Sequence, residues 1–311
     1  MPLLHHIAKA VNRALGPLGV AVSRSEKTPW NIGKKIADTQ VGRFKIQVPT
    51  INPICRHYQL YPNWSSQLGR LTSILKGKYA NLAAIDVGAN VGDTACIIKS
   101  AEDIPLLCIE GDEFTFGFLQ KNIAQFRNTS AHQLFLGEKT TTVSVDFEKA
   151  GWNTTLKLGS SSSAKAVKLT SLDDFLVSQP GIEAFKLLKI DTEWFDCSII
   201  RGGSNFIQNV SPVITFEYNR GNMDAIGEPG LPTLSMLQGL GYSRIAFHDQ
   251  DGRFLLSASM ADTGLVQDLH DYADCVRGRT GYLDITVFQE NDTDLAEAFV
   301  AHERTRRAAG N

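Results

Sequence analysis

Four carboxylates in this sequence follow short apolar runs: Asp86, Glu110, Asp191 and Glu217. Such runs are typical of strands buried in a parallel sheet. The carboxyl ends of parallel strands meet at one edge of the sheet, where ligands bind, so we expect the four side chains to surround one pocket. Carboxylates in a pocket can accept hydrogen bonds from hydroxyls, pair with cations or take up a proton during a reaction.

The run that ends at Asp86 leads into a glycine turn with the spacing Asp-x-Gly-x-Asn-x-Gly. The turn contains Gly88, Ala89, Asn90 and Gly92, and Asp93 or Thr94 can then cap a helix. Glycine lets the backbone approach a ligand closely, and a helix N-terminus offers unpaired N–H groups to an anion. The order of strand, glycine turn and helix start predicts a nucleotide-binding βαβ unit.

The spacing differs from the G-x-G-x-x-G of enzymes that bind nicotinamide dinucleotides. Asp86 at the strand end repels a pyrophosphate but suits an ammonium group, so the pattern favours S-adenosyl-L-methionine over NAD. Glu110 follows Asp86 by 24 residues, close to the roughly 20-residue spacing at which an acid binds a nucleotide ribose. The alternatives are a plain glycine-rich turn and an exposed acid in the cluster at residues 110–113.

Strand and helix patterns alternate along the chain. This alternation predicts an α/β fold with a doubly wound, mainly parallel, seven-stranded Rossmann-like sheet. The strands are expected at residues 83–87, 106–110, 133–136, 185–190, 213–216, 242–247 and 282–288. An alternating apolar pattern at residues 141–147 predicts a β-hairpin arm. We expect an N-terminal helical and irregular cap at residues 1–80, the cofactor-binding domain at 81–290 and a helical tail at 291–311.

The composition excludes several classes of protein. With 43% apolar residues and a net charge of −2 over 311 residues, the chain resembles ordinary globular proteins and lacks the basic character of nucleic-acid binders. The five cysteines are scattered without a C-x-x-C pattern, which indicates reduced thiols in a cytoplasmic protein and no zinc site. No apolar run is long enough to span a bilayer.

An amphipathic helix is expected within the first twenty residues. Packing on the main domain is the expected use of this helix, and peripheral contact with a membrane surface is the alternative. A homodimer is compatible with the sequence, which leaves the oligomeric state open.

Five stretches of the chain together resemble one protein family. They are IDVGANVGDT, CIEGDEFTFGFLQKN, LTSLDDFL, LLKIDTEWFDCSIIRGG and VITFEYN, in this order. Over about residues 58–290 the chain resembles the FkbM-type methyltransferases, which are S-adenosylmethionine-dependent O-methyltransferases with a Rossmann-like class I fold. The resemblance implies that the glycine turn lines the methionine end of the cofactor, with Asp86 near its ammonium group. It also implies that Glu110 holds the ribose and that Asp191 lies beside cofactor and acceptor.

The resemblance also implies the kind of acceptor. Acceptors in this family are hydroxyl groups of sugars, glycans and polyketide-type natural products, so a small-molecule or glycan partner is expected. The chain departs from the family at Trp194, where glycine is usual, and at Gly203, where alanine is commoner. Trp194 adds bulk beside the acceptor site, and Glu193 is another expected acceptor contact. Apart from the resemblance, Tyr61 is an expected contact that could cover a ligand, and aromatic packing under a loop is the alternative.

An aliphatic hydroxyl needs a base as it attacks a methyl group. The candidates are Asp191, Glu217 and His248. A histidine side chain titrates near neutral pH, which favours His248, and a plain loop histidine is the alternative. Asp191, Glu193 and Glu217 offer oxygen ligands suited to Mg²⁺, but no cluster of recognisable spacing accompanies them, so no metal site is predicted.

Three other classes of function stay open at this point. A nicotinamide-dependent oxidoreductase is disfavoured by the missing third glycine and by Asp86. A methyltransferase-fold binding module without turnover is disfavoured by the complete set of acids at the strand ends. A methyltransferase acting on nitrogen or on protein often carries an N/D-P-P-Y/F motif after the fourth strand, whereas residues 191–194 read Asp-Thr-Glu-Trp.

Overall fold

The computed structural model describes residues 36–61, 63–150, 153–158, 165–192, 194–249, 251–275 and 282–308. The predicted N-terminal amphipathic helix and the predicted acceptor contact Glu193 lie outside these residues. In the part of the chain that is described, no helix has the length and apolar character needed to cross a membrane.

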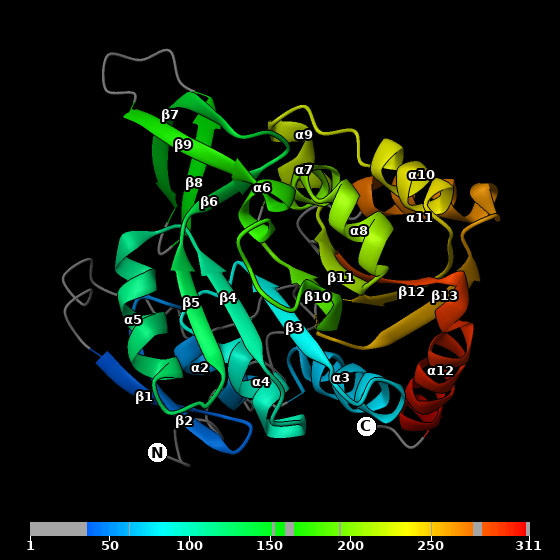
Figure 1. The fold of residues 1–311 in the computed structure, drawn as a ribbon, viewed down its shortest axis with the longest axis horizontal. Helices are drawn as coiled ribbons and strands as arrows, with labels where there is room; N and C mark the ends of the chain where they lie inside the picture. The colour runs from blue at the N-terminus through cyan, green and yellow to red at the C-terminus, as the bar shows by residue number, and fades with distance from the viewer. Residues whose placement is uncertain are drawn as a thin grey trace, which may run out of the picture. The chain divides into compact units, whose positions relative to one another are not determined.

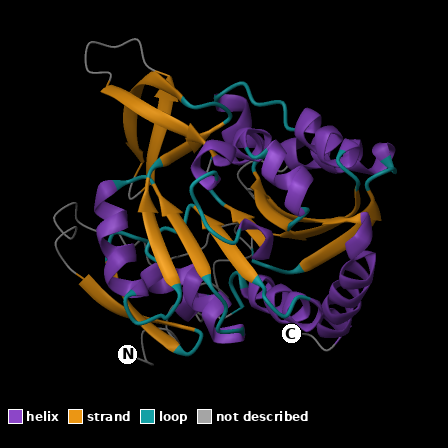
Figure 2. Ribbon diagram, viewed as in Figure 1, coloured by secondary structure: helices purple, strands orange, loops and turns teal. Residues whose placement is uncertain are grey.

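A central sheet of eight strands organises the fold (Figure 1, Figure 2). Its spatial order is β13 (Phe254–Ser259), β12 (Tyr242–Asp249), β14 (Leu283–Gln289), β11 (Val213–Tyr218), β10 (Phe185–Ile190), β3 (Ala83–Val87), β4 (Leu106–Glu110) and β5 (Thr129–Gln133). Strands β11, β10, β3, β4 and β5 pair in parallel, and β14 enters antiparallel between β11 and β12. The predicted α/β fold with a mainly parallel sheet is confirmed, with β13 as an additional edge strand.

Helices cover both faces of this sheet, because successive strand residues point to opposite sides and both sides are apolar. One face packs against α2 (Ile54–Leu60), α3 (Ser66–Lys78), α4 (Asp93–Ala101), α5 (Glu113–Ile123) and α12 (Thr293–Ala308). The other face packs against α6 (Leu172–Leu176), α7 (Asp196–Gly202), α8 (Ser204–Val210), α9 (Arg220–Ala225), α10 (Leu231–Gly239) and α11 (Thr263–Cys275). Two short 3₁₀ helices, η3 (Ile182–Ala184) and η4 (Glu290–Asp292), flank β10 and α12.

The third predicted strand is misplaced, and β13 was not predicted. The strand beside β4 is β5 (Thr129–Gln133) rather than residues 133–136. Both β5 and β13 are edge strands, and most of their side chains are only partly buried. An edge strand buries little apolar surface, so it carries a weak apolar pattern in the sequence.

A second sheet lies beyond the end of β5 (Figure 1). It contains β6 (Phe135–Gly137), β9 (Lys165–Ser171), β7 (Thr141–Ala150) and β8 (Asn153–Leu158), in this spatial order. Strands β7 and β8 pair antiparallel, which confirms the predicted hairpin arm. Ser171 caps α6 by accepting a hydrogen bond from the backbone N–H of Asp174, so the arm leads directly back into the main domain.

The segment before β3 packs on the main sheet through a hairpin and two helices. Strands β1 (Ile36–Val41) and β2 (Phe44–Pro49) form the hairpin. The Asn122 side chain on α5 exchanges two hydrogen bonds of 2.9 Å with the backbone of Gln47 on β2. Helix α3 contacts both α4 and α12. These contacts bring α2 and the start of α3 to the carboxyl edge of the sheet.

Candidate active site

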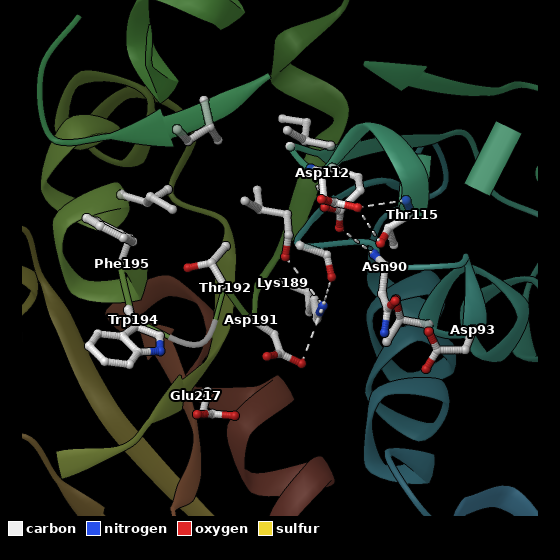
Figure 3. Close-up of a pocket in the computed structure, with 18 of the residues that line it drawn as sticks. Asn90, Asp93, Asp112, Thr115, Lys189, Asp191, Thr192, Trp194, Phe195 and Glu217 are labelled. Carbon is white, nitrogen blue, oxygen red and sulfur yellow. Dashed lines mark hydrogen bonds and ion pairs between the residues drawn. The ribbon is translucent and has the colours of Figure 1, made fainter. Parts of the chain in front are cut away.

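A cavity of about 380 Å³ opens at the carboxyl edge of the sheet (Figure 3). This volume lies in the range of roughly 300–1,000 Å³ that is usual for small-molecule sites. The ends of β3, β4, β10 and β11 contribute to its wall, and His57 and Trp64 contribute from the N-terminal segment. The predicted meeting of strand ends at one pocket is therefore observed for Glu110, Asp191 and Glu217, all of which line it.

The glycine turn after β3 has left-handed backbone at Gly88 (φ 70°), Asn90 (φ 49°) and Gly92 (φ 89°). A Cβ at Gly88 would lie 1.8 Å from the carbonyl oxygen of Asp191, so only glycine lets the ends of β3 and β10 approach this closely. The N-cap of α4 is Gly92, and no side chain caps the helix. The predicted cap by Asp93 or Thr94 is wrong, because both side chains have other hydrogen-bond partners.

The N-terminal segment is tied to this turn by two side-chain hydrogen bonds. The Tyr58 hydroxyl on α2 donates to Asp93 Oδ2 at 2.9 Å, and the Asn52 amide donates to Asn90 Oδ1 at 3.1 Å. Burial raises the pKa of Asp93 to about 6, against the lowering effects of Lys189 and the Tyr58 hydrogen bond. Asp93 lines the cavity at the start of α4. A carboxyl group that titrates close to neutral pH therefore faces the ligand space.

Lys189 on β10 places a positive charge between two carboxylates at the bottom of the cavity. Its Nζ lies 3.1 Å from Asp86 Oδ1 and 3.7 Å from Asp191 Oδ2, and it donates to the Gly88 carbonyl at 3.0 Å. Burial alone would lower the pKa of Lys189, but the Asp86, Asp191 and Asp93 carboxylates raise it well above its usual value. The ammonium group therefore stays charged, and it links the glycine turn to the end of β10 (Figure 3).

Asp86 does not have the position predicted for it. Its side chain is fully buried and is not among the groups that line the cavity. Oδ2 accepts a hydrogen bond of 2.5 Å from the Thr94 hydroxyl, and Oδ1 faces Lys189. The charge of Asp86 is already paired with Lys189, which lines the cavity. Asp86 can therefore affect a ligand only by positioning Lys189, and not by contact with an ammonium group of the ligand.

Glu110 lines the cavity at the end of β4 with both carboxylate oxygens held by the backbone. Oε2 accepts from the N–H of Asn90 at 3.0 Å, and Oε1 accepts from the N–H of Asp112 at 2.9 Å. Burial raises the pKa of Glu110 to about 7, although the two N–H groups act in the opposite direction. Each oxygen keeps a further lone pair, so the carboxylate can accept from two neighbouring hydroxyls of a ligand.

The opposite end of the cavity combines acids with aromatic side chains. Asp191 has a half-exposed side chain at the end of β10, and Glu217 lines the cavity from β11. Trp194 and Phe195 follow Asp191 in the chain and also line the cavity. Figure 3 shows Asp191, Glu217 and Trp194 on the side of the view away from Asp112 and Thr115.

His248 is not part of the site, which corrects its predicted role as a base. Its side chain is fully buried, and its ring packs between Phe254 and Phe299. His248 Nε2 lies 3.6 Å from Glu303 Oε2. Although burial opposes the change, His248 and Arg70 lower the pKa of Glu303 to about 2. His248 therefore belongs to a buried polar cluster with α12 and has no access to the cavity.

Three other predicted residues lie beside the cavity without lining it. Ala89 and Gly92 are buried within the turn. Tyr61 is 43% exposed, and its ring packs against His57 and Trp64, which do line the cavity. Gly88, Asn90, Asp93, Thr94 and Trp194 line it as expected for contacts of a ligand. Over the residues that the structure describes, no cluster of three or more metal-binding side chains is present.

The sequence analysis does not predict two residues that shape this region, although the sequence contains an indication of one of them. Lys189 is a lysine inside the apolar strand FKLLKI, and a buried cation in such a strand indicates an acidic partner nearby. Tyr58 left no signal, because its partner Asp93 is distant in sequence and the contact depends on how α2 packs.

A family model identifies the kind of domain in this chain. The family model of the FkbM methyltransferase domain matches residues 86–244, slightly more than half of the chain. The solved structure of the methyltransferase FkbM from Methylobacillus flagellatus is similar at 18% identity and a TM-score of 0.36, over 53% of this chain and 39% of that one. This chain thus matches well under half the length of that protein.

Two further solved structures cover more of the chain. TYW2 from P. horikoshii, in complex with MeSAdo, is 12% identical, with a TM-score of 0.41 over 92% of this chain and 84% of that one. TYW2 from M. jannaschii, in complex with AdoMet, is 6% identical, with a TM-score of 0.39 over 82% and 86%. No curated protein sequence matches this chain.

Replacing Lys189 tests the charge balance at the bottom of the cavity. Lys189→Met leaves the Asp86 carboxylate buried without its cation, so we expect a loss of about 3–5 kcal/mol in the free energy of unfolding. Urea denaturation measures this loss. The double variant Lys189→Met with Asp86→Asn removes the orphaned charge as well, and it should recover part of the stability.

The matched control for this prediction is Lys168→Met, which removes an exposed lysine of β9. It should change the free energy of unfolding by less than about 0.5 kcal/mol. A Lys189→Met variant as stable as this control would contradict the assigned role of Lys189.

Proposed function

This chain belongs to the FkbM methyltransferase family, and we propose that it methylates a hydroxyl group of a sugar, a glycan or a related natural product. The cofactor of the enzyme is S-adenosylmethionine. The observation that supports the proposal best is the cavity itself. At one end of the cavity, two backbone N–H groups orient the Glu110 carboxylate, and at the other end acids lie beside aromatic side chains.

The donors and acceptors of the cavity fit this cofactor. Glu110 would hold the ribose through the free lone pairs of its two oxygens. Asp93 and Asp191 would hold the ammonium group, in place of Asp86, because both line the cavity. Apolar side chains next to Glu110, among them Ile109 and Leu134, would cover the adenine ring.

When bound, the cofactor supplies a methyl group on a positively charged sulfur. The residues of the chain have to hold the acceptor oxygen in line with that methyl group, to exclude water and to take up the hydroxyl proton. Glu217 is the base that we propose, since it lies on rigid strand β11 and lines the cavity. Asp191 is less suited to this task, because Lys189 lies 3.7 Å from its carboxylate.

The aromatic wall supports a hydroxylated ring as acceptor. Trp194, Phe195, His57 and Trp64 line the cavity together with Asp191 and Glu217. The flat apolar face of a sugar ring can pack against an aromatic side chain while carboxylates accept its hydroxyl protons. Trp194 stands where the family usually has glycine, so we propose that it narrows the space for the acceptor.

Calorimetric titration with S-adenosylmethionine tests the cofactor site. We expect wild-type protein to bind it and Glu110→Ala to bind it at least about tenfold more weakly, a loss of about 1.4 kcal/mol. The matched control is Glu113→Ala, which removes an exposed acid from the first turn of α5 and should leave the affinity unchanged. Binding of NADH instead of S-adenosylmethionine would refute the proposal.

The affinity for S-adenosylmethionine should depend on pH through Glu110. Only the ionised carboxylate accepts hydrogen bonds with both oxygens, and its pKa is about 7 in the folded protein. Protonation below neutral pH therefore competes with the ligand, and we expect binding about tenfold weaker at pH 6 than at pH 8. The same titrations with Glu110→Gln should lose most of this dependence and keep about a twofold difference from Asp93. An equal affinity of wild type at both pH values would contradict the assignment.

Trp194→Ala separates the acceptor site from the cofactor site. With a panel of methyl glycosides and polyols, product formation is followed by mass spectrometry and by release of S-adenosylhomocysteine. We expect kcat/KM for the best acceptor to change by about tenfold, while the Kd for S-adenosylmethionine changes less than about twofold. The control is Tyr272→Ala, an exposed aromatic side chain on α11. An equal loss of cofactor affinity would show that Trp194 does not act on the acceptor.

A further inference from the structure

Asp284 on β14 lies next to the proposed base Glu217. The strand register sets Asp284 directly opposite Glu217 on β11 and opposite His248 on β12. Directly opposite residues of antiparallel strands share one face of the sheet, with Cβ atoms about 4.5–5.5 Å apart. Glu217 lines the cavity, and Asp284, which is not among the lining residues, lies beside it in the sheet.

A side chain of helix α3, which packs on this face of the sheet, orients the Asp284 carboxyl group. The Gln67 side-chain amide, which is 7% exposed, donates to Asp284 Oδ2 at 3.0 Å. An amide is neutral, so this contact orients the carboxyl group without neutralising a negative charge on it. Lys189 is engaged with Asp86 and Asp191, and its attraction offsets only part of the effect of burial on Asp284.

Several charged or titratable groups face Asp284 from the surrounding elements. They are Glu217 on β11, His248 and Asp249 on β12, Lys189 and Asp191 at the end of β10, and Asp196 at the start of α7. Burial, followed by the negative charge of Asp191, raises the pKa of Asp284 to about 8, and Lys189 opposes this change. In its ionised form, Asp284 therefore binds a proton more strongly than an ordinary carboxylate does.

We propose that Glu217 and Asp284 form a carboxyl pair that takes up the acceptor's proton together, with Glu217 in contact with the hydroxyl and Asp284 as its positioning residue. The inference rests on the proposed function, since it names the proton acceptor of that reaction. A lone glutamate of ordinary acidity is a poor base for a hydroxyl. A doubly ionised pair is a better base, because the negative charge of each carboxylate raises the proton affinity of the other.

One proton leaves the acceptor hydroxyl during the proposed transfer. While the acceptor oxygen bonds to the methyl carbon and the carbon–sulfur bond breaks with its electron pair going to sulfur, Glu217 takes the hydroxyl proton. The pair then carries one proton and one negative charge, with the proton between two adjacent carboxyl groups. Loss of this proton to solvent through the open side of the cavity restores the doubly ionised pair.

The first test is the pH dependence of kcat for Asp284→Asn, at saturating S-adenosylmethionine and with the best methyl glycoside of the panel. Asparagine keeps an oxygen for the Gln67 amide and cannot ionise. We expect wild-type kcat to rise with pH and to level off by about pH 8, because the positive charges of the bound cofactor favour the ionised pair. In Asp284→Asn, kcat should be about 10- to 100-fold lower at pH 8, and this rise should be absent.

Two further variants serve as comparisons for Asp284→Asn. Glu217→Gln should lose at least about 100-fold in kcat at every pH, since it removes the group that contacts the hydroxyl. The matched control is Asp251→Asn, in the turn after β12, where the carboxylate pairs with Arg253. It should keep the wild-type profile. An Asp284→Asn variant that keeps the wild-type rise with pH would overturn the proposal, whatever its absolute rate.

The second test needs no turnover. Infrared difference spectra of the protein without ligand, recorded between pH 6 and 10, show the C=O band of protonated carboxyl groups. We expect one component that titrates near pH 8 in wild type, is missing in Asp284→Asn and moves to lower pH in Glu217→Gln. A component that Glu217→Gln leaves in place would overturn the coupling of the two groups.

The two tests also separate the inference from the proposed function. Absence of cofactor binding and turnover, together with a coupled titration in the spectra, would refute methyl transfer and leave the carboxyl pair standing. Turnover with an uncoupled Asp284 would refute the pair and leave methyl transfer standing.

Discussion

The buried ammonium group of Lys189 is the interaction on which the cavity depends. It lies between Asp86 and Asp191 and holds the Gly88 carbonyl, so one side chain joins the ends of β3 and β10 to the glycine turn. Gly88 has no Cβ, which lets the backbone of β3 come close enough for these contacts. Buried carboxylates repel each other unless a cation is held among them. Lys189 therefore supplies the cation that the buried Asp86 carboxylate needs at this edge of the sheet.

The sequence predicted the parts of the site that depend on strand ends. Apolar runs located β3, β4, β10 and β11 correctly, and parallel pairing then brought Glu110, Asp191 and Glu217 to one cavity. Face and burial were harder to predict. Asp86 and His248 share one face of the sheet with Glu217, but of these three only Glu217 lines the cavity. Thr94 and Lys189 enclose Asp86, and two phenylalanine rings enclose His248. The period of a strand predicts which residues share a face of the sheet, but it does not predict which helix covers that face.

The remaining errors come from contacts between distant parts of the chain. Tyr58 meets Asp93 only because α2 folds over the glycine turn, and Gln67 meets Asp284 only because α3 crosses the sheet there. No local pattern predicts such pairs. The edge strands β5 and β13 were misplaced or missed for a different reason, since a strand with little buried surface has little apolar signal.

The acids around the cavity bind more protons at neutral pH than free carboxylates do. Burial raises the pKa of Asp93 to about 6, of Glu110 and Asp196 to about 7, and of Asp284 to about 8. Among the described residues that line the cavity, Lys189 carries the permanent positive charge, and Asp86 and Asp191 already use it. A ligand with an ammonium and a sulfonium group supplies the missing charge and favours the ionised acids. Binding of the cofactor is then linked to release of protons, so cofactor binding itself helps to keep the acids of the cavity ionised.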